Sequence, residues 1–196
     1  LCSASKVQQI ENSFGLNYIK NMNLSDELEK ELVKQSLYRL VLHEVGHTLG
    51  LNHNFKASTL LSNDELNNKE IVKERGVTSS VMDYPAINIT KDPNNQGLYF
   101  DVKPGYYDMW AIEFGYTEYN ESENEDKLLA DILSRSTEKE LAFANDALDM
   151  RSPGRGTDPN AMIYDLSNTQ IEHSIDKIEM IFEILKDLKT KYTSEN

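Results

Sequence analysis

The stretch from His43 to His53 constrains the fold and chemistry of this chain more than any other, because it reads HEVGHTLGLNH and holds three of the four histidines. In a helix, residues four apart lie on the same face, so His43 and His47 can direct two imidazole nitrogens at one metal ion. Gly50 favours the left-handed backbone that ends a helix and turns the chain back. The pattern therefore predicts a helix that ends near Gly50 and a return that brings His53 to a third ligand position.

Glu44 directly follows the first histidine and so lies beside the ligand face. From there a carboxylate can reach a water at the metal without being a ligand itself. Three neutral histidines would also leave a fourth position on a tetrahedral Zn²⁺ open, which is typical of a catalytic site and not of a structural one. The motif thus predicts one catalytic zinc ion with Glu44 as general base. Histidines that are merely solvated are the less favoured interpretation.

A second motif, SSVMDYP at residues 79–85, places a methionine two residues before a tyrosine. With this addition the sequence resembles the metzincins, zinc endopeptidases defined by the long histidine motif and a downstream Met-turn. It is particularly similar to large bacterial zinc-dependent metalloproteases of this class, and residues 105–116 resemble the helix that follows their Met-turn. The likeness covers about residues 25–116 and is weaker around 143–166.

The resemblance implies a zinc-dependent endopeptidase that acts on a protein or peptide substrate. It assigns residues by position: the metal ligands His43, His47 and His53, the catalytic base Glu44, and Met82 as the floor beneath the metal. Tyr84 is a further catalytic candidate, because a phenol near zinc can stabilise an oxyanion. Taken alone, Met82 would be an ordinary core methionine and Tyr84 a partly buried aromatic. The alternative function is a catalytically silent metzincin-like scaffold or binding module, which has no need of Glu44.

The sequence predicts a mainly α fold. The resemblance implies an α+β metzincin-like catalytic domain, with the zinc helix followed by a helical C-terminal part, and we expect its N-terminal sheet to be missing from this chain. The family places that sheet before the zinc helix, but the residues before His43 read as helical. Spacing and caps predict helices at about 4–20, 25–50, 105–116, 124–148 and 171–188, and a short strand is conceivable only at 99–102. The last helix carries an apolar stripe that is expected to pack on the domain, with docking to a partner helix as the less favoured alternative: Ile171, Ile175, Ile178, Phe182, Leu185 and Leu188.

We expect one domain over residues 1–196, with the zinc helix at about 25–50, an irregular Met-turn region at 52–104 and a helical part at 105–196. Because the chain starts at Leu1, we expect it to be a fragment of a larger protein with upstream domains. The resemblance implies an extracytoplasmic location: periplasmic, cell-surface or secreted.

The net charge of −13 and a pI near 4.7 disfavour nucleic acid and anionic membrane surfaces as partners, since both are negatively charged. No run of about 18 apolar residues is present, so no membrane span is expected. Cys2 is the one cysteine, which excludes an intrachain disulfide. An acidic cluster is typical of a solvated loop and helix start: Glu118, Glu121, Glu123, Glu125 and Asp126.

Other candidate ligands carry less weight. Glu65, with Glu70 and Glu74 behind it, could complete a His₂Glu zinc site, but His53 already supplies a third ligand. His173 is expected to be a surface histidine, and the sequence PGRG at 153–156 a turn. Four residues offer oxygen ligands for calcium, although their spacing fits no EF-hand: Asn145, Asp146, Asp149 and Asp158.

Overall fold

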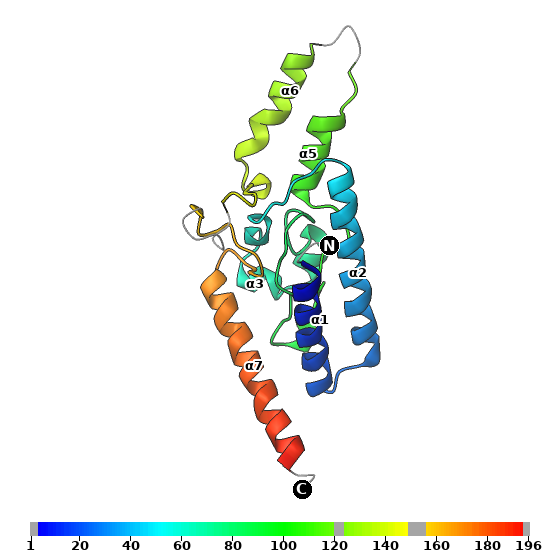
Figure 1. Cartoon of the computed structure of the whole chain (residues 1–196), viewed down its shortest axis with the longest axis vertical. Coiled ribbons are helices and arrows are strands. Elements are labelled where there is room, and N and C mark those ends of the chain that lie inside the picture. Colours follow the sequence, from blue (N-terminus) through cyan, green and yellow to red (C-terminus); the bar gives the residue numbers. More distant parts are fainter. Residues whose placement is uncertain (1–3, 120–123, 149–155, 194–196) are drawn as a thin grey trace.

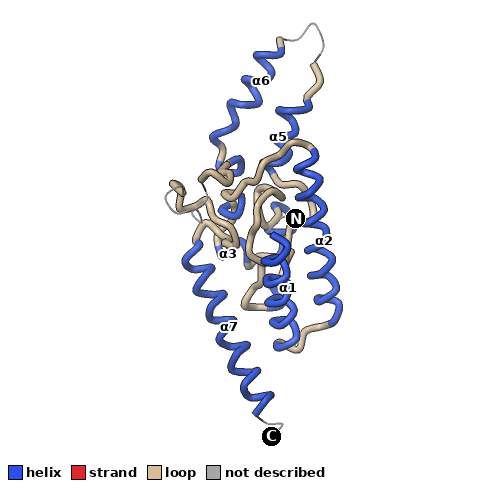
Figure 2. The backbone as a smooth tube through the Cα atoms, viewed as in Figure 1, coloured by secondary structure: helices blue, strands red, loops and turns tan. Residues whose placement is uncertain are grey.

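The fold is mainly helical, as predicted. The computed structural model describes residues 4–119, 124–148 and 156–193, and helices are the regular elements within these ranges (Figure 1). Figure 2 shows the long loops that connect them at the centre of the molecule. Among these described residues, no helix combines the length and the apolar character that a bilayer crossing requires.

The strand considered at 99–102 does not form. The backbone amides of Tyr99 and Phe100 both donate hydrogen bonds to Oε1 of the buried Gln35, at 2.7 and 3.2 Å. Because a side chain takes both donors, the segment makes no ladder of backbone hydrogen bonds. In the described part of the chain before His43 the structure is also helical and contains no strand.

An antiparallel helical hairpin opens the fold, in which α1 (Ala4–Asn21) and α2 (Asp26–Thr48) pack side by side (Figure 1). Ser25 occupies the N-cap position of α2 with extended backbone, φ −74° and ψ 150°, and acidic residues fill the first turn, where they interact favourably with the helix dipole. The buried face of the hairpin is partly polar, since Asn12 donates to Oγ of Ser36 at 2.8 Å. Directional contacts of this kind fix the rotation of α2 and hence the face that carries its histidines.

The region between α2 and α5 (Tyr106–Tyr116) is mainly loop, in agreement with the predicted irregular region. It also contains four short helical segments that were not predicted: η1 (Ala57–Thr59), α3 (Asn63–Leu66), α4 (Lys69–Arg75) and η2 (Pro93–Asn95). Apolar residues of this region pack with Leu166 into one core cluster beneath α3 and α4. A second cluster joins α1, α2 and α7 (Gln170–Thr193) to the loop around Ile87 and Phe100.

Two buried carboxylates shape the loop directly before Met82. Asp101 accepts hydrogen bonds from the backbone amides of Val77 and Thr78 at 2.7 and 3.1 Å, and Asp108 accepts one from the amide of Val81 at 2.9 Å. Burial raises the pKa of Asp101 to about 6, against the effect of these hydrogen bonds. The loop thus has a fixed shape because side chains satisfy its buried backbone donors.

The helix predicted at 105–116 is present as α5, but the single helix predicted over 124–148 is wrong beyond Leu133. There α6 (Glu125–Leu133) gives way to two short turns, η3 (Ser134–Thr137) and η4 (Lys139–Leu141). Farther on, the amide of Ala144 donates to Oδ1 of Asn54 at 3.1 Å. The carbonyl of Ala144 accepts from the amide of Phe55 at 2.7 Å. The segment bonds to the chain after His53 instead of to its own preceding turn.

The last helix, α7, is present, but it does not pack through the predicted stripe. Ile171, Ile175, Ile178, Phe182 and Leu185 are exposed, and the buried residues are instead His173, Met180 and Ile184. A polar contact on the docked face accompanies the packing of Met180 and Ile184: Nζ of Lys177 lies 2.8 Å from both carboxylate oxygens of Glu11 in α1.

The prediction that His173 lies on the surface is wrong, since its exposed fraction is only 7%. Its Nδ1 donates to the side-chain carbonyl of Asn63 at 3.2 Å. Burial lowers its pKa to about 4.

Candidate metal centre

Three histidines converge at the C-terminal end of α2. His43 and His47 belong to the helix, and His53 to the loop after it, and one ligand nitrogen of each lies within 4.8 Å of the other two. The return is made as predicted: α2 ends at Thr48 and Gly50 has φ +87°, in the region that favours glycine. The donor set therefore forms a compact cluster of a size compatible with one metal ion.

The second nitrogen of each ring fixes its orientation. Nδ1 of His43 lies 2.8 Å from the carbonyl oxygen of Val81, and Nδ1 of His47 lies 3.0 Å from the carbonyl oxygen of Leu51. In His53 it lies 2.9 Å from a carboxylate oxygen of Asp146. Carbonyl and carboxylate oxygens only accept, so each Nδ1 carries the proton and each Nε2 presents a lone pair.

The buried ring of His43 is compatible with a ligand at this place. Its Nε2 is buried and has no hydrogen-bond partner among the described residues. A buried acceptor without a partner is costly unless something occupies it. Burial lowers the pKa of His43 to about 3, although its hydrogen bond to the Val81 carbonyl acts in the opposite direction. The imidazole is thus neutral at pH 7, the form that binds a metal, and the residues present fit a metal ion.

Tyr84, predicted as a partly buried aromatic or a catalytic group, lies at the cluster. Its hydroxyl is 2.7 Å from Nε2 of His53, and its ring stacks on that of His43 with centroids 4.9 Å apart. With the proton of His53 on Nδ1, the phenol donates this hydrogen bond. Arg39, one turn before His43, places its guanidinium 5.7 Å from the centre of the Tyr84 ring.

Met82 is fully buried against α2. A Cβ atom on Gly46 would lie 2.3 Å from its sulfur, so the thioether packs on the helix backbone directly before His47. The glycine is required at this position because the methionine occupies the space of a side chain. Met82 is thus brought to the helix that carries two of the histidines.

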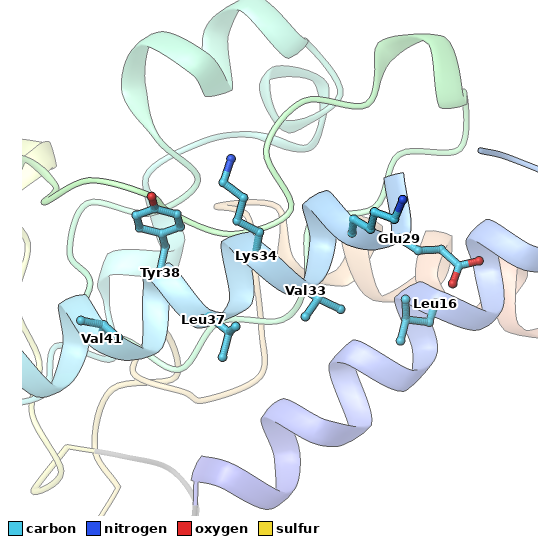
Figure 3. Close-up of a pocket in the computed structure, with 8 residues that line it drawn as sticks. Leu16, Glu29, Val33, Lys34, Leu37, Tyr38 and Val41 are labelled. Carbon is cyan, nitrogen blue, oxygen red and sulfur yellow. The ribbon is translucent and has the colours of Figure 1, made fainter. Parts of the chain in front are cut away.

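Glu44 is exposed on α2, next to the apolar Val41 and Val45, which are also exposed. Figure 3 shows a groove farther along the same helix, with a volume of about 700 Å³, to which Val33 and Leu37 of α2 and Leu16 of α1 contribute. The same helix therefore carries two of the three histidines near its end and an apolar groove along its length.

The alternative ligands lie elsewhere. Glu65 closes the capping box of α3 with Ser62 and lies 3.5 Å from Arg75, so the His₂Glu interpretation is wrong for the described structure. Of the suggested calcium ligands, Asp158 is 2.6 Å from Nζ of Lys56 and Asp146 contacts His53. Several residues discussed above lie outside the described part of the chain: Cys2, Glu121, Glu123, Asp149 and 153–155.

Sequence reasoning missed the role of two groups at the cluster, Asp146 and the carbonyl of Val81. The first lies 93 positions beyond His53 and the second 38 beyond His43. No local pattern encodes contacts over such separations, so only the folded chain reveals them.

Comparison with known proteins gives one result of weight: a Met-zincin family model matches residues 25–196. Neither the curated proteins nor the solved structures include a match to this chain.

Proposed function

Since the chain belongs to the Met-zincin family, we propose that it is a zinc-dependent endopeptidase that hydrolyses peptide bonds at the three-histidine cluster. The observation that carries this proposal is the shared orientation of the rings. Each Nδ1 has an acceptor, and each Nε2 is left with a lone pair within the cluster. Zinc is the metal that the family implies, and three imidazoles are a usual ligand set for its catalytic sites.

His43, His47 and His53 would hold the ion through Nε2. When bound, zinc supplies Lewis-acid chemistry, because it polarises a carbonyl group and makes water acidic near neutral pH. Met82 would serve as the floor of the site through its contact with α2 at Gly46.

Glu44 is the proposed general base. It follows His43 on α2 and is exposed, so its carboxylate is accessible to a substrate and to water. It would accept a proton from the attacking water and pass it to the nitrogen of the leaving amine. The presence of this carboxylate favours hydrolysis over the alternative of a silent scaffold, which needs ligands but no base.

Tyr84 is proposed as a donor to the oxyanion of the tetrahedral intermediate. Its hydroxyl donates to Nε2 of His53 across 2.7 Å. One lone pair cannot accept this proton and bind a metal at the same time. When His53 binds the metal, the hydroxyl of Tyr84 would therefore be able to donate its hydrogen bond to the substrate instead.

The substrate class is a protein or peptide, and we propose an extracytoplasmic location. Both proposals rest on the resemblance of the zinc motif and the Met-turn to those of the metzincins.

The test compares zinc content and hydrolysis of a denatured protein substrate across four proteins: the wild type, Glu44→Gln, His53→Ala and Glu27→Gln. Glu27 is an exposed acid at the start of α2 and controls for the loss of one charge. We expect Glu44→Gln to keep zinc and lose hydrolysis by at least about 10²-fold, His53→Ala to bind zinc more weakly, and Glu27→Gln to match the wild type. The proposal would be overturned if the purified wild type contained no zinc, or if Glu44→Gln hydrolysed the substrate as fast as the wild type.

A further inference from the structure

Asp146 makes a contact with the metal centre that the zinc motif does not contain. Its two carboxylate oxygens lie 2.9 and 3.1 Å from Nδ1 of His53. The side chain of His53 is 19% exposed and that of Asp146 is 62% exposed, so the carboxylate approaches the ring from the solvent side.

The backbone holds Asp146 in this place. Nδ2 of Asn54 donates to the carbonyl of Ala142 at 3.0 Å, and its Oδ1 accepts from the amide of Ala144 at 3.1 Å. The amide of Phe55 completes the connection at 2.7 Å from the carbonyl of Ala144. The two residues that follow His53 therefore fasten the segment that ends in Asp146.

Beyond this fastening, the chain turns. Oδ1 of Asn145 accepts from the amide of Ala147 at 3.1 Å, and the carbonyl of Asn145 accepts from the amide of Leu148 at 2.9 Å. Asp146 lies inside this turn, with both flanking residues hydrogen-bonded. Its position beside His53 is thus set by local backbone structure as well as by the contact itself.

The three histidines are not equivalent in this respect. Nδ1 of His43 and of His47 donates to a neutral backbone carbonyl, whereas Nδ1 of His53 donates to a carboxylate. A hydrogen bond to an ionised acceptor is stronger than one to a neutral acceptor. A carboxylate behind a metal-binding imidazole fixes the tautomer and makes the ring a stronger ligand.

We propose that Asp146 is a positioning residue of the metal centre, which holds the proton of His53 on Nδ1 and directs its Nε2 lone pair toward His43 and His47. The inference rests on the proposed metal site and deepens it. His53 needs such a partner most, because it is the ligand that lies outside the helix.

If Asp146 only stabilised the fold, its loss would lower the melting temperature of the metal-free protein. The contact joins the Asp146 carboxylate, which is 62% exposed, to a neutral imidazole, and contacts of this kind at the surface contribute little to folding stability. Loss of the Asp146 carboxylate should therefore leave the melting temperature of the metal-free protein nearly unchanged and appear in metal affinity instead.

The first experiment measures zinc affinity by competition with a chromogenic chelator, at one pH, for the wild type, Asp146→Ala, Asp146→Asn and Asp158→Asn. We expect Asp146→Ala to bind zinc roughly 10–100-fold more weakly. Asp146→Asn should lose less, since its amide oxygen still accepts from Nδ1. Asp158→Asn removes the same charge from the partner of Lys56 and should match the wild type. Equal affinity in Asp146→Ala and Asp158→Asn would overturn the inference.

The second experiment needs no metal and separates this inference from the proposed function. The ring nitrogens of His53 are observed by ¹⁵N nuclear magnetic resonance in Tyr84→Phe, which removes the phenol that donates to Nε2. We expect the proton on Nδ1 in Tyr84→Phe and a loss of this tautomer when Asp146→Ala is added. An unchanged tautomer would refute the role of Asp146. A wild type that binds no zinc would instead refute the proposed function, and the tautomer would then decide the inference alone.

Discussion

Replacement of Gly46 by alanine tests the packing of Met82 against α2, directly before His47. In an unobstructed helix interior, this change stabilises a protein by about 0.5–1 kcal/mol, because glycine is a poor helix former. Here the new Cβ would lie 2.3 Å from the sulfur of Met82 and 3.7 Å from Cδ1 of Leu51. Met82 is fully buried, so its side chain has little room to move. Overpacking of this kind costs about 1–3 kcal/mol.

The two effects combine to a net loss of up to about 2 kcal/mol for Gly46→Ala. In a domain of this size, that corresponds to a fall in melting temperature of roughly 4–8 °C. The assay is urea denaturation of the metal-free protein, so that any change in metal affinity does not enter the result. Gly115→Ala in α5 is the matched control, because among the described residues no atom outside its own stretch of helix lies within 4 Å of its new Cβ, and it should not destabilise the protein.

A second background completes the test. Met82→Ala alone should cost about 2–5 kcal/mol as a buried truncation. Gly46→Ala added to it should then be neutral or stabilising, because the obstructing sulfur is absent. If Gly46→Ala stabilises the wild type as much as it stabilises Met82→Ala, the methionine does not pack where the structure places it, and its proposed role as the floor of the site is lost.

Two further predictions concern a buried histidine and the phenol at the cluster. Burial lowers the pKa of His173 to about 4, so the unfolded chain binds more protons than the folded chain between pH 6.5 and 4. Its contribution to stability is therefore present above pH 6.5 and is lost as the pH falls through this window, by up to about 3 kcal/mol. Denaturation of metal-free wild type and His173→Phe at several pH values should show the steeper decline in the wild type, and parallel curves would contradict the assignment. Tyr84→Phe should keep zinc and lower kcat by about 10²-fold if the hydroxyl stabilises the oxyanion; unchanged kcat in steady-state assays would return Tyr84 to a packing role.

The sequence was informative where the determining contacts are local. The convergence of His43 and His47 follows from helical spacing, and the approach of His53 follows from the turn at Gly50. The bounds of α1, α2 and α5 agree with the predicted helices to within one or two residues. In these elements the backbone bonds to near neighbours in the chain, so the local pattern carries the necessary information.

Three of the failures have distant causes. Gln35 in α2 takes the amides that a strand at 99–102 would have used. Asn54 draws the backbone of Ala144 away from the predicted helix. α7 packs on the domain through Met180 and Ile184 and through the ion pair of Lys177 with Glu11, so its predicted apolar stripe remains exposed. In each case contacts with residues far away in the sequence decided the outcome, which periodicity alone cannot reveal.

The separation between His53 and Asp146 also has a consequence for biosynthesis. A ribosome delivers the chain from the N-terminus, so the complete zinc motif emerges well before its carboxylate partner, which lies 93 residues later. The hydrogen bonds of the Asn54 side chain likewise form only after Ala142 and Ala144 have been synthesised. Contacts over such distances form late in folding. A nascent chain therefore carries all three histidines for some time before the third is held in place, and the centre matures only when most of the domain has been made.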